Sequence, residues 1–163
     1  MIAAMSPHSR TLNAVSGFLE LGMPEDAWEE LDTVPPGQRD REEICEMRIA
    51  VLMRLEKWEG ARIDAEAMAK RHPGNSGWWI SWAYALRREK SVPEAREVLL
   101  QAAQLHPGEL MIFYNLACYA SVLGELDEAR KLLARVFSED SDFREMAMED
   151  PDLVGVFGAG EID

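Results

Sequence analysis

The sequence repeats itself at a fixed interval of 34 residues. An alanine recurs four times at this spacing, at Ala27, Ala61, Ala95 and Ala129. The apolar residues four and seven positions after each alanine recur with it, and the tripeptide His72-Pro73-Gly74 recurs as His106-Pro107-Gly108. A period of about 20 to 50 residues is typical of arrays that stack one structural unit on the next. The chain is therefore predicted to be such an array.

Each unit carries two helical stripes separated by a short break. Between Trp79 and Leu86, for example, apolar residues recur at steps of three and four, which indicates an amphipathic helix. Pro93 marks the break in this unit, and Gly22 and Gly124 mark it in others. A second stripe follows each break, so each unit is predicted to be a helical hairpin.

The repeated alanines and prolines have physical reasons. Two antiparallel helices joined by a tight turn approach each other closely just after the turn, where a larger side chain would force them apart. Pro73 and Pro107 cannot continue a helix, so each is predicted to end the second helix of its unit. The glycine that follows each proline lets the chain reverse.

These residues resemble the tetratricopeptide repeat (TPR) family. Residues 123–129 (Leu-Gly-Glu-Leu-Asp-Glu-Ala) match the family's turn signature, and residues 114–117 (Tyr-Asn-Leu-Ala) match the middle of its first helix. Residues 8–41 fit less well, because Thr11, Ala14 and Val15 replace bulkier core residues and Pro35-Pro36 comes early. The resemblance covers about 136 residues. It is specific for the fold and not for a ligand.

The resemblance implies an all-α fold, a right-handed superhelical array of antiparallel helix pairs (a TPR-like α-solenoid). We expect a single domain over residues 1–163, with repeats at about 8–41, 42–75, 76–109 and 110–143 and a capping helix and tail over 141–163. The cap is expected because the last unit must cover its apolar face. Pro151 should end the capping helix, after which Leu153, Val154, Val156 and Phe157 are expected to pack back before an acidic tail.

Composition excludes some classes of partner. With 30 acidic against 17 basic residues, the net charge of −13 repels phosphate backbones and anionic membrane surfaces. We therefore expect no nucleic acid and no membrane partner. The start of the chain lacks the pattern of a secretory signal, and no apolar stretch is long enough to cross a bilayer. Together with only two cysteines, Cys45 and Cys118, this predicts a cytoplasmic location.

No residue pattern indicates catalysis. His72 and His106 are repeat-equivalent and precede structural prolines, and with His8 they offer no converging metal ligands. The acidic residues around Glu25 fit a helix start. A reactive thiol is the alternative for the cysteines, but no basic cluster supports it. We expect no enzyme activity, no cofactor and no metal.

One stripe on the first helices is assigned by the resemblance to a partner-binding groove. Its predicted residues are Met53 in the second unit, Ile80, Tyr84 and Arg87 in the third, and Met111, Tyr114, Asn115 and Cys118 in the fourth. Glu46 and Ala50 fall on the same side. An aromatic and methionine stripe of this kind is alternatively core, and Trp78 is left unassigned by either view.

The resemblance implies a non-catalytic protein–protein interaction module that binds a peptide or helix of a partner protein in this groove. The identity of the partner is unknown. A carboxylate clamp is disfavoured, because Glu46, Ala50, Ser81 and Met111 stand where its basic residues would be needed. The alternative is a secretion-type chaperone that protects an apolar export substrate. Weak homo-oligomer formation through the first unit also stays open.

Overall fold

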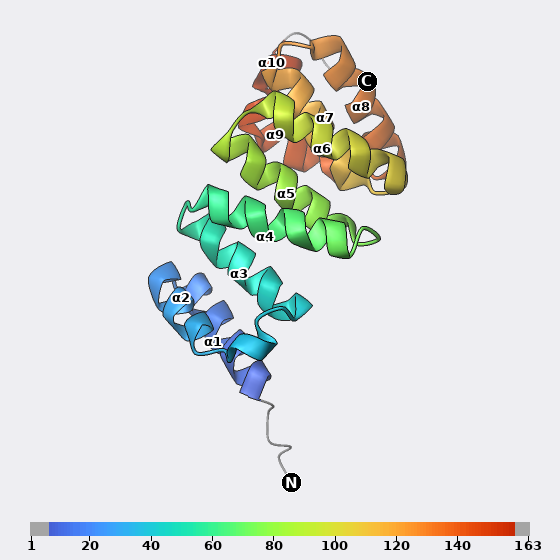
Figure 1. The fold of residues 1–163 in the computed structure, drawn as a ribbon. Coiled ribbons are helices and arrows are strands. Elements are labelled where there is room, and N and C mark those ends of the chain that lie inside the picture. The colour runs from blue at the N-terminus through green and yellow to red at the C-terminus, as the bar shows by residue number, and fades with distance from the viewer. Residues whose placement is uncertain (1–6, 159–163) are drawn as a thin grey trace.

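The computed structural model describes residues 7–158, which form helices joined by short turns (Figure 1). The helices pair in chain order, and a short terminal group follows the fourth pair. They are α1 (Pro7–Glu20), α2 (Pro24–Asp32), α3 (Glu42–Arg54), α4 (Trp58–Arg71), α5 (Ser76–Glu89), α6 (Val92–Leu105), α7 (Leu110–Val122), α8 (Leu126–Glu139), α9 (Phe143–Glu149) and α10 (Val154–Phe157). Single 3₁₀ turns span Pro36–Gln38 and Pro151–Leu153. The predicted acidic tail beyond residue 158 lies outside the described residues.

Successive helix pairs stack side by side from the N-terminal end to the C-terminal end, as Figure 1 shows. Equivalent helices begin at one interval, since α3, α5 and α7 start at Glu42, Ser76 and Leu110. The second helices α4, α6 and α8 keep the same spacing. The predicted array of antiparallel helix pairs is therefore confirmed.

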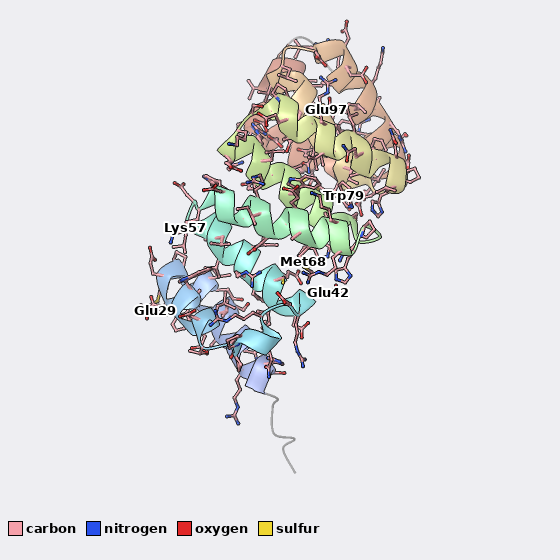
Figure 2. The ribbon with its side chains drawn as sticks, in the orientation of Figure 1. Glu29, Glu42, Lys57, Met68, Trp79 and Glu97 are labelled. Carbon is pink, nitrogen blue, oxygen red and sulfur yellow. The ribbon has the colours of Figure 1, made fainter. Side chains whose placement is uncertain are left out.

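The repeated small residues lie where the helices approach. Ala27, Ala61, Ala95 and Ala129 are all 0% exposed. The stripe that follows them is buried too, including Leu99 and Leu133. Trp79 lies inside the stack, whereas Glu29 and Glu97 lie on its outside (Figure 2). Burial of these stripes against the neighbouring pair is the main stabilising term for each unit.

The backbone carbonyl of Pro73 joins two neighbouring units. The indole Nε1 of Trp79 donates a hydrogen bond to it over 3.1 Å, and Nε2 of His106 lies 2.8 Å away. His72 occupies the equivalent place one unit earlier, where its Nδ1 lies 3.3 Å from a carboxylate oxygen of Glu42. The contact of His106 therefore joins two neighbouring units, whereas that of His72 joins the two helices of one unit.

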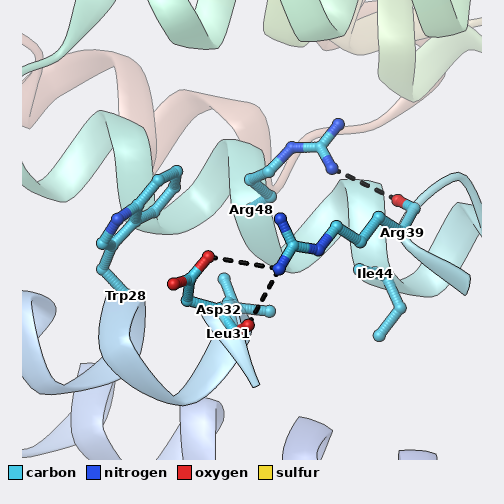
Figure 3. A pocket seen from close by; sticks show the side chains of 6 residues that line it. All are labelled: Trp28, Leu31, Asp32, Arg39, Ile44 and Arg48. Atoms are coloured by element: carbon cyan, nitrogen blue, oxygen red, sulfur yellow. Dashed lines mark hydrogen bonds and ion pairs between the residues drawn. The ribbon is translucent and has the colours of Figure 1, made fainter. Parts of the chain in front are cut away.

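The first helix pair departs from the others. Helix α2 has 9 residues, whereas α4, α6 and α8 have 14 each. Because α2 ends at Asp32, the backbone carbonyls there need other donors. Arg39 supplies them, donating from Nε to the Val34 oxygen and from Nη2 to the Asp32 oxygen, both at 2.9 Å. Figure 3 shows Arg39 beside Asp32, with Arg48 donating to the Arg39 carbonyl. The pocket around them has a volume of only about 70 Å³.

The turns inside the pairs differ in backbone conformation. Gly22 and Gly124 have φ of 70° and 82°, a region that glycine enters without steric cost. Glu56 stands at the equivalent position of the second unit with φ of 55°, and Lys90 in the third unit has φ of −121°. Glu56 is therefore the position where a side chain is held in a strained turn.

No helix in the described part of the chain combines the length and apolar character that a membrane span needs.

Replacing Trp79 with Ala should lower the free energy of unfolding by about 3 to 5 kcal/mol, because a buried indole is removed and a cavity is left. Urea denaturation followed by circular dichroism measures this change. Leu105→Ala is the matched control, since its side chain is largely exposed and its loss should cost less than about 1 kcal/mol. Equal effects of the two substitutions would contradict the placement of Trp79 in the core.

Replacing Glu56 with Gly should raise the free energy of unfolding by about 0.5 to 1 kcal/mol, because it relieves the left-handed backbone strain. Lys90→Gly, at the equivalent turn with negative φ, should instead lower it, because glycine adds entropy to the unfolded chain. Thermal melts of the two variants test the pair. The explanation fails if both substitutions change stability in the same direction.

Candidate functional site

We define the groove face as the stripes of α3, α5 and α7 that carry the eight predicted binding residues. Their exposure varies widely. Tyr84 is 41% exposed, Met53, Ile80, Arg87, Met111 and Asn115 are partly buried, and Tyr114 and Cys118 are buried. Exposure is thus greatest on α5 and least on α7.

Four of the predicted residues line one pocket between α5 and α7. Tyr84 and Arg87 come from α5, and Asn115 and Cys118 come from α7. The pocket has a volume of about 280 Å³. Residues spaced by three or four along two neighbouring helices face the same space, which is why these four come together. Met53, Ile80 and Met111 do not line this pocket.

A third wall of the pocket comes from the end of the chain. We call residues 143–157, which comprise α9, the 3₁₀ turn and α10, the C-terminal segment. Within it, Asp150, Pro151 and Asp152 line the pocket. Leu153 and Val156 are fully buried, so the expectation that they pack back on the array is confirmed. Val154 instead points to solvent, because it lies on the outer side of the short helix α10.

Three groove residues bind the carboxylates of the C-terminal segment. The guanidinium of Arg87 donates from Nη1 and Nη2 to the two carboxylate oxygens of Asp152, at 2.5 and 2.8 Å. The hydroxyl of Tyr114 donates to Oδ2 of Asp150 over 2.8 Å, and Sγ of Cys118 lies 3.5 Å from the same oxygen. Bidentate and charge-assisted hydrogen bonds of this kind are the strong ones in proteins.

Tyr114 and Cys118 therefore do not face open solvent, as their assignment to a groove would require. The ring of Phe143 lies 5.5 Å from that of Tyr114, and only 3% of Tyr114 is exposed. The sequence pattern placed both residues on the groove side of α7 but missed the segment that covers them. Their contact with a partner stays a prediction that requires this segment to move.

Tyr84 is fixed by aromatic and cationic neighbours. Its ring meets that of Trp58 edge-on, with 6.1 Å between centroids. The guanidinium of Arg88 lies 4.1 Å from the Tyr84 ring centroid and 5.2 Å from that of Trp58. Within residues 7–158, no carboxylate pairs with Arg88, and the side-chain amide of Asn115 makes no hydrogen bond. The pocket thus has a guanidinium that stacks on two aromatic rings, and an amide that makes no hydrogen bond within the described residues.

The remainder of the groove face runs from α5 to α3. A second pocket, of about 170 Å³, is lined there by Glu42 and Glu46 from α3 and by Trp78 and Ser81 from α5. Trp78 is buried, and its Nε1 has no hydrogen-bond partner among the described residues. Met53 and Ile80 pack against the core with part of each side chain accessible. The carboxylates at this end belong to α3, whereas those at the α5–α7 end come from the C-terminal segment.

Burial sets the ionisation of the groups on α7. Burial raises the pKa of Cys118, and the negative charge of Asp150 raises it further. Burial and the hydrogen bond to Asp150 raise the pKa of Tyr114. Burial also raises the pKa of Tyr119 to about 12, although Arg87 opposes the rise. All three groups stay protonated at neutral pH, so Tyr114 can donate to Asp150 and Cys118 is a poor nucleophile.

Ligand atoms of Cys118, Asp150 and Asp152 lie within 4.8 Å of one another, a spacing that a metal ion could bridge. The carboxylates already have protein partners, because Arg87 pairs with Asp152 and Tyr114 donates to Asp150. The guanidinium supplies the positive charge that two neighbouring carboxylates require. The cluster is therefore accounted for by the contacts that hold the C-terminal segment.

Sequence analysis missed Arg88, Tyr119 and the pair of aspartates at the pocket. Arg88 follows the predicted groove residue Arg87, and a stripe one residue wider would have included it. The aspartates flank Pro151, which was interpreted only as a helix stop. An Asp-Pro-Asp turn placed opposite two arginines is a charge pattern that could have suggested the contact.

Comparison with known proteins identifies the fold. The structure is similar to that of MamA, residues 41 to the end, from Desulfovibrio magneticus RS-1, with a TM-score of 0.70 and 16% identity over 81% of this chain and 75% of that one. A thermophilic TPR protein of Thermus thermophilus gives a TM-score of 0.69 and 15% identity over 82% and 74% of the two chains. No family model and no curated protein matches the sequence. The chain thus has the TPR fold, a right-handed superhelical array of helix pairs.

Alkylation of Cys45 and Cys118 by iodoacetamide at pH 8 should be much slower in the native chain than in urea, because burial raises the pKa of both thiols and so lowers the fraction present as thiolate. Mass spectrometry of Cys45→Ser and Cys118→Ser resolves the two sites. A thiol that reacts equally fast in both states would show that it is accessible and reactive.

Proposed function

We propose, from the premise of a TPR-type array, that this protein is a non-catalytic interaction module that holds a peptide or helix of another protein along its groove face. Four of the predicted residues, Tyr84, Arg87, Asn115 and Cys118, line one pocket on that face. Partner identity is not part of the proposal. The eight predicted residues remain its site, with Arg88 added to them.

The observation that carries the proposal is the combination of Tyr84 and Arg88 beside an open polar pocket. Tyr84 presents a large ring whose motion is already restricted by Trp58 and Arg88. An aromatic ring fixed before binding offers contact area at little entropic cost, and Tyr and Arg are enriched among residues that dominate interface energies. Such a pair, exposed on a helix, is typical of a partner-binding surface.

The C-terminal segment gives independent support. It lies against α7 as a 3₁₀ turn between two small helices, and groove residues donate hydrogen bonds to its two carboxylates. A surface that binds one polypeptide segment by side-chain hydrogen bonds has the shape and chemistry to bind another. This argues for a peptide-sized ligand in preference to a flat contact between large surfaces.

The alternative proposal, a secretion-type chaperone, requires an extended apolar surface. Met53, Ile80 and Met111 would supply it, but each is partly buried, and the two pockets of the groove face are lined in part by Glu46, Ser81 and Arg87. The mixed polar lining favours an interaction module with a partly polar ligand. Co-expression with a translocator protein that becomes soluble only in its presence would favour the chaperone.

Replacing Tyr84 and Arg88 together by Ala should abolish capture of a specific partner protein from cell extract, because it removes the exposed aromatic ring and the guanidinium stacked on it from the groove face. Affinity capture followed by quantitative mass spectrometry measures the loss. The melting temperature should fall by no more than a few degrees, since Tyr84 and Arg88 are exposed.

Leu100→Ala with Lys131→Ala is the matched control, because both residues are exposed on the second helices α6 and α8, away from the groove face. This control variant should capture the partner as the unmodified chain does. If both double variants retain every captured protein, the groove face is not the binding site. If the Tyr84 and Arg88 variant unfolds at a much lower temperature, Tyr84 belongs to the core and leaves the site.

A further inference from the structure

We propose that the pocket between α3 and α5 holds one basic side chain of the partner segment together with a main-chain carbonyl group beside it. The inference rests on the proposed function, because it names a residue that the bound segment must carry. This α3–α5 pocket has a volume of about 170 Å³. It is lined by Glu42 and Glu46 of α3 and by Asn75, Gly77, Trp78 and Ser81 at the start of α5.

Two carboxylates of α3 line this pocket without a basic residue beside them. Glu42 and Glu46 are four residues apart, so they lie on one side of the helix, and like charges at this spacing repel each other. Glu46 makes no ion pair within residues 7–158. Glu42 has only Nδ1 of His72, 3.3 Å away, which is an ion pair only when the imidazole is protonated. No lysine or arginine of the described chain lines the pocket, so a cation from outside would relieve the repulsion.

The indole of Trp78 is a second, independent indication of a ligand. Only 5% of this residue is exposed, and its Nε1 has no acceptor among the described residues. Nε1 of the adjacent Trp79 shows the usual arrangement, because it donates to the Pro73 carbonyl over 3.1 Å. A buried N–H group without an acceptor costs free energy, and a ligand that brings an acceptor recovers it. Because Nε1 is closed to water in the free chain, this bond forms only as the pocket adjusts around the ligand.

A basic residue within a peptide meets both requirements. Its side chain carries the cation for Glu42 and Glu46, and its main chain carries the carbonyl oxygen for Trp78. A metal ion or a simple amine would satisfy the carboxylates but leave the indole N–H without an acceptor. An acidic residue would be repelled by both glutamates. The hydroxyl of Ser81 adds a further acceptor for an ammonium or guanidinium group.

The charge of the whole chain favours the same ligand. A net charge of −13 attracts a basic segment and speeds its association. At the α5–α7 end of the groove face, Arg87 and Tyr114 already donate to the carboxylates of the C-terminal segment. The carboxylates of α3 have no such donors among residues 7–158 apart from the imidazole of His72. The α3–α5 pocket is therefore where a cation of the partner gains most.

A minimal ligand tests this without knowledge of the natural partner. The probe is N-acetyl-L-arginine methylamide, which has a guanidinium group and peptide carbonyl groups on both sides of its Cα atom. The comparison compound is N-acetyl-L-citrulline methylamide, which has nearly the same shape and no charge. Binding to the ¹⁵N-labelled full chain is followed by NMR at physiological salt. Each of the five tryptophans gives one indole N–H signal, and Trp78→Phe identifies that of Trp78.

Two double variants separate the pocket from the general charge of the protein. Glu42→Gln/Glu46→Gln removes both carboxylates from the pocket. Glu29→Gln/Glu97→Gln is the matched control, because it changes the net charge equally but acts on the outside of the stack (Figure 2). All four side chains are exposed, so both variants should melt within a few degrees of the unmodified chain.

The arginine compound should shift the Trp78 indole signal of the unmodified chain until the site is saturated. The Trp79 signal should stay in place, because its N–H group already donates to Pro73. Glu42→Gln/Glu46→Gln should weaken binding about fivefold or more, because charge-assisted hydrogen bonds are lost. The control variant should weaken it less than about twofold, since distant charges are screened. The citrulline compound should bind about fivefold or more weakly than the arginine compound.

Equal binding of the two compounds, or a Trp78 signal that does not shift, would overturn the proposal. Equal weakening by the two double variants would also overturn it, since the attraction would then belong to the overall charge and not to the pocket. A large drop in the melting temperature of Glu42→Gln/Glu46→Gln alone would show that these carboxylates stabilise the fold, and it would refute their role as an open site.

Failure here is distinguishable from failure of the proposed function. The NMR titration tests only the α3–α5 pocket and its preference for a cation, whereas the capture experiment tests Tyr84 and Arg88 with the natural partner. Capture that depends on Tyr84 and Arg88, together with no shift of the Trp78 signal, would leave the interaction module in place and remove only the basic residue from its ligand.

Discussion

Close approach of paired helices at four alanines is the constraint on which the structure depends. Each alanine is fully buried just after the turn of its pair, and the apolar residues that follow it meet the neighbouring pair. Because the spacing is constant, each pair stacks on the previous one in the same orientation. The groove face is a consequence of this regularity, since equivalent stripes of α3, α5 and α7 are placed side by side. A larger side chain at one crossing would change both packing and groove.

The end of the array imposes the second constraint. Without a further unit, α8 would leave apolar surface open, and Leu153 and Val156 cover it. The turn that delivers these two residues also carries Asp150 and Asp152 to the groove residues Arg87 and Tyr114. Covering the last unit and occupying the groove are therefore linked in one short segment. Stability at the C-terminal end and access to the α7 side of the groove depend on the same contacts.

The sequence predicted the features that repeat and missed those that do not. Ala61, Trp79 and Pro73 could be placed because each has equivalents at a fixed offset and a single packing role. Tyr114 could not, because a stripe at helical spacing shows which side of α7 a residue occupies but not what lies beyond that side. The covering residues come 36 positions later, in a segment with no repeat partner. Glu56 was missed for a related reason, since the period identified its turn but not the sign of its φ.

Charge also favours carboxylates that belong to the chain itself at this place. With a net charge of −13, the protein repels an acidic segment that comes within one Debye length of its surface, about 8 Å at physiological salt. Asp150 and Asp152 reach Tyr114 and Arg87 without crossing this field, because the backbone already holds them nearby. The ion pair of Asp152 with Arg87 therefore forms although the protein as a whole is acidic.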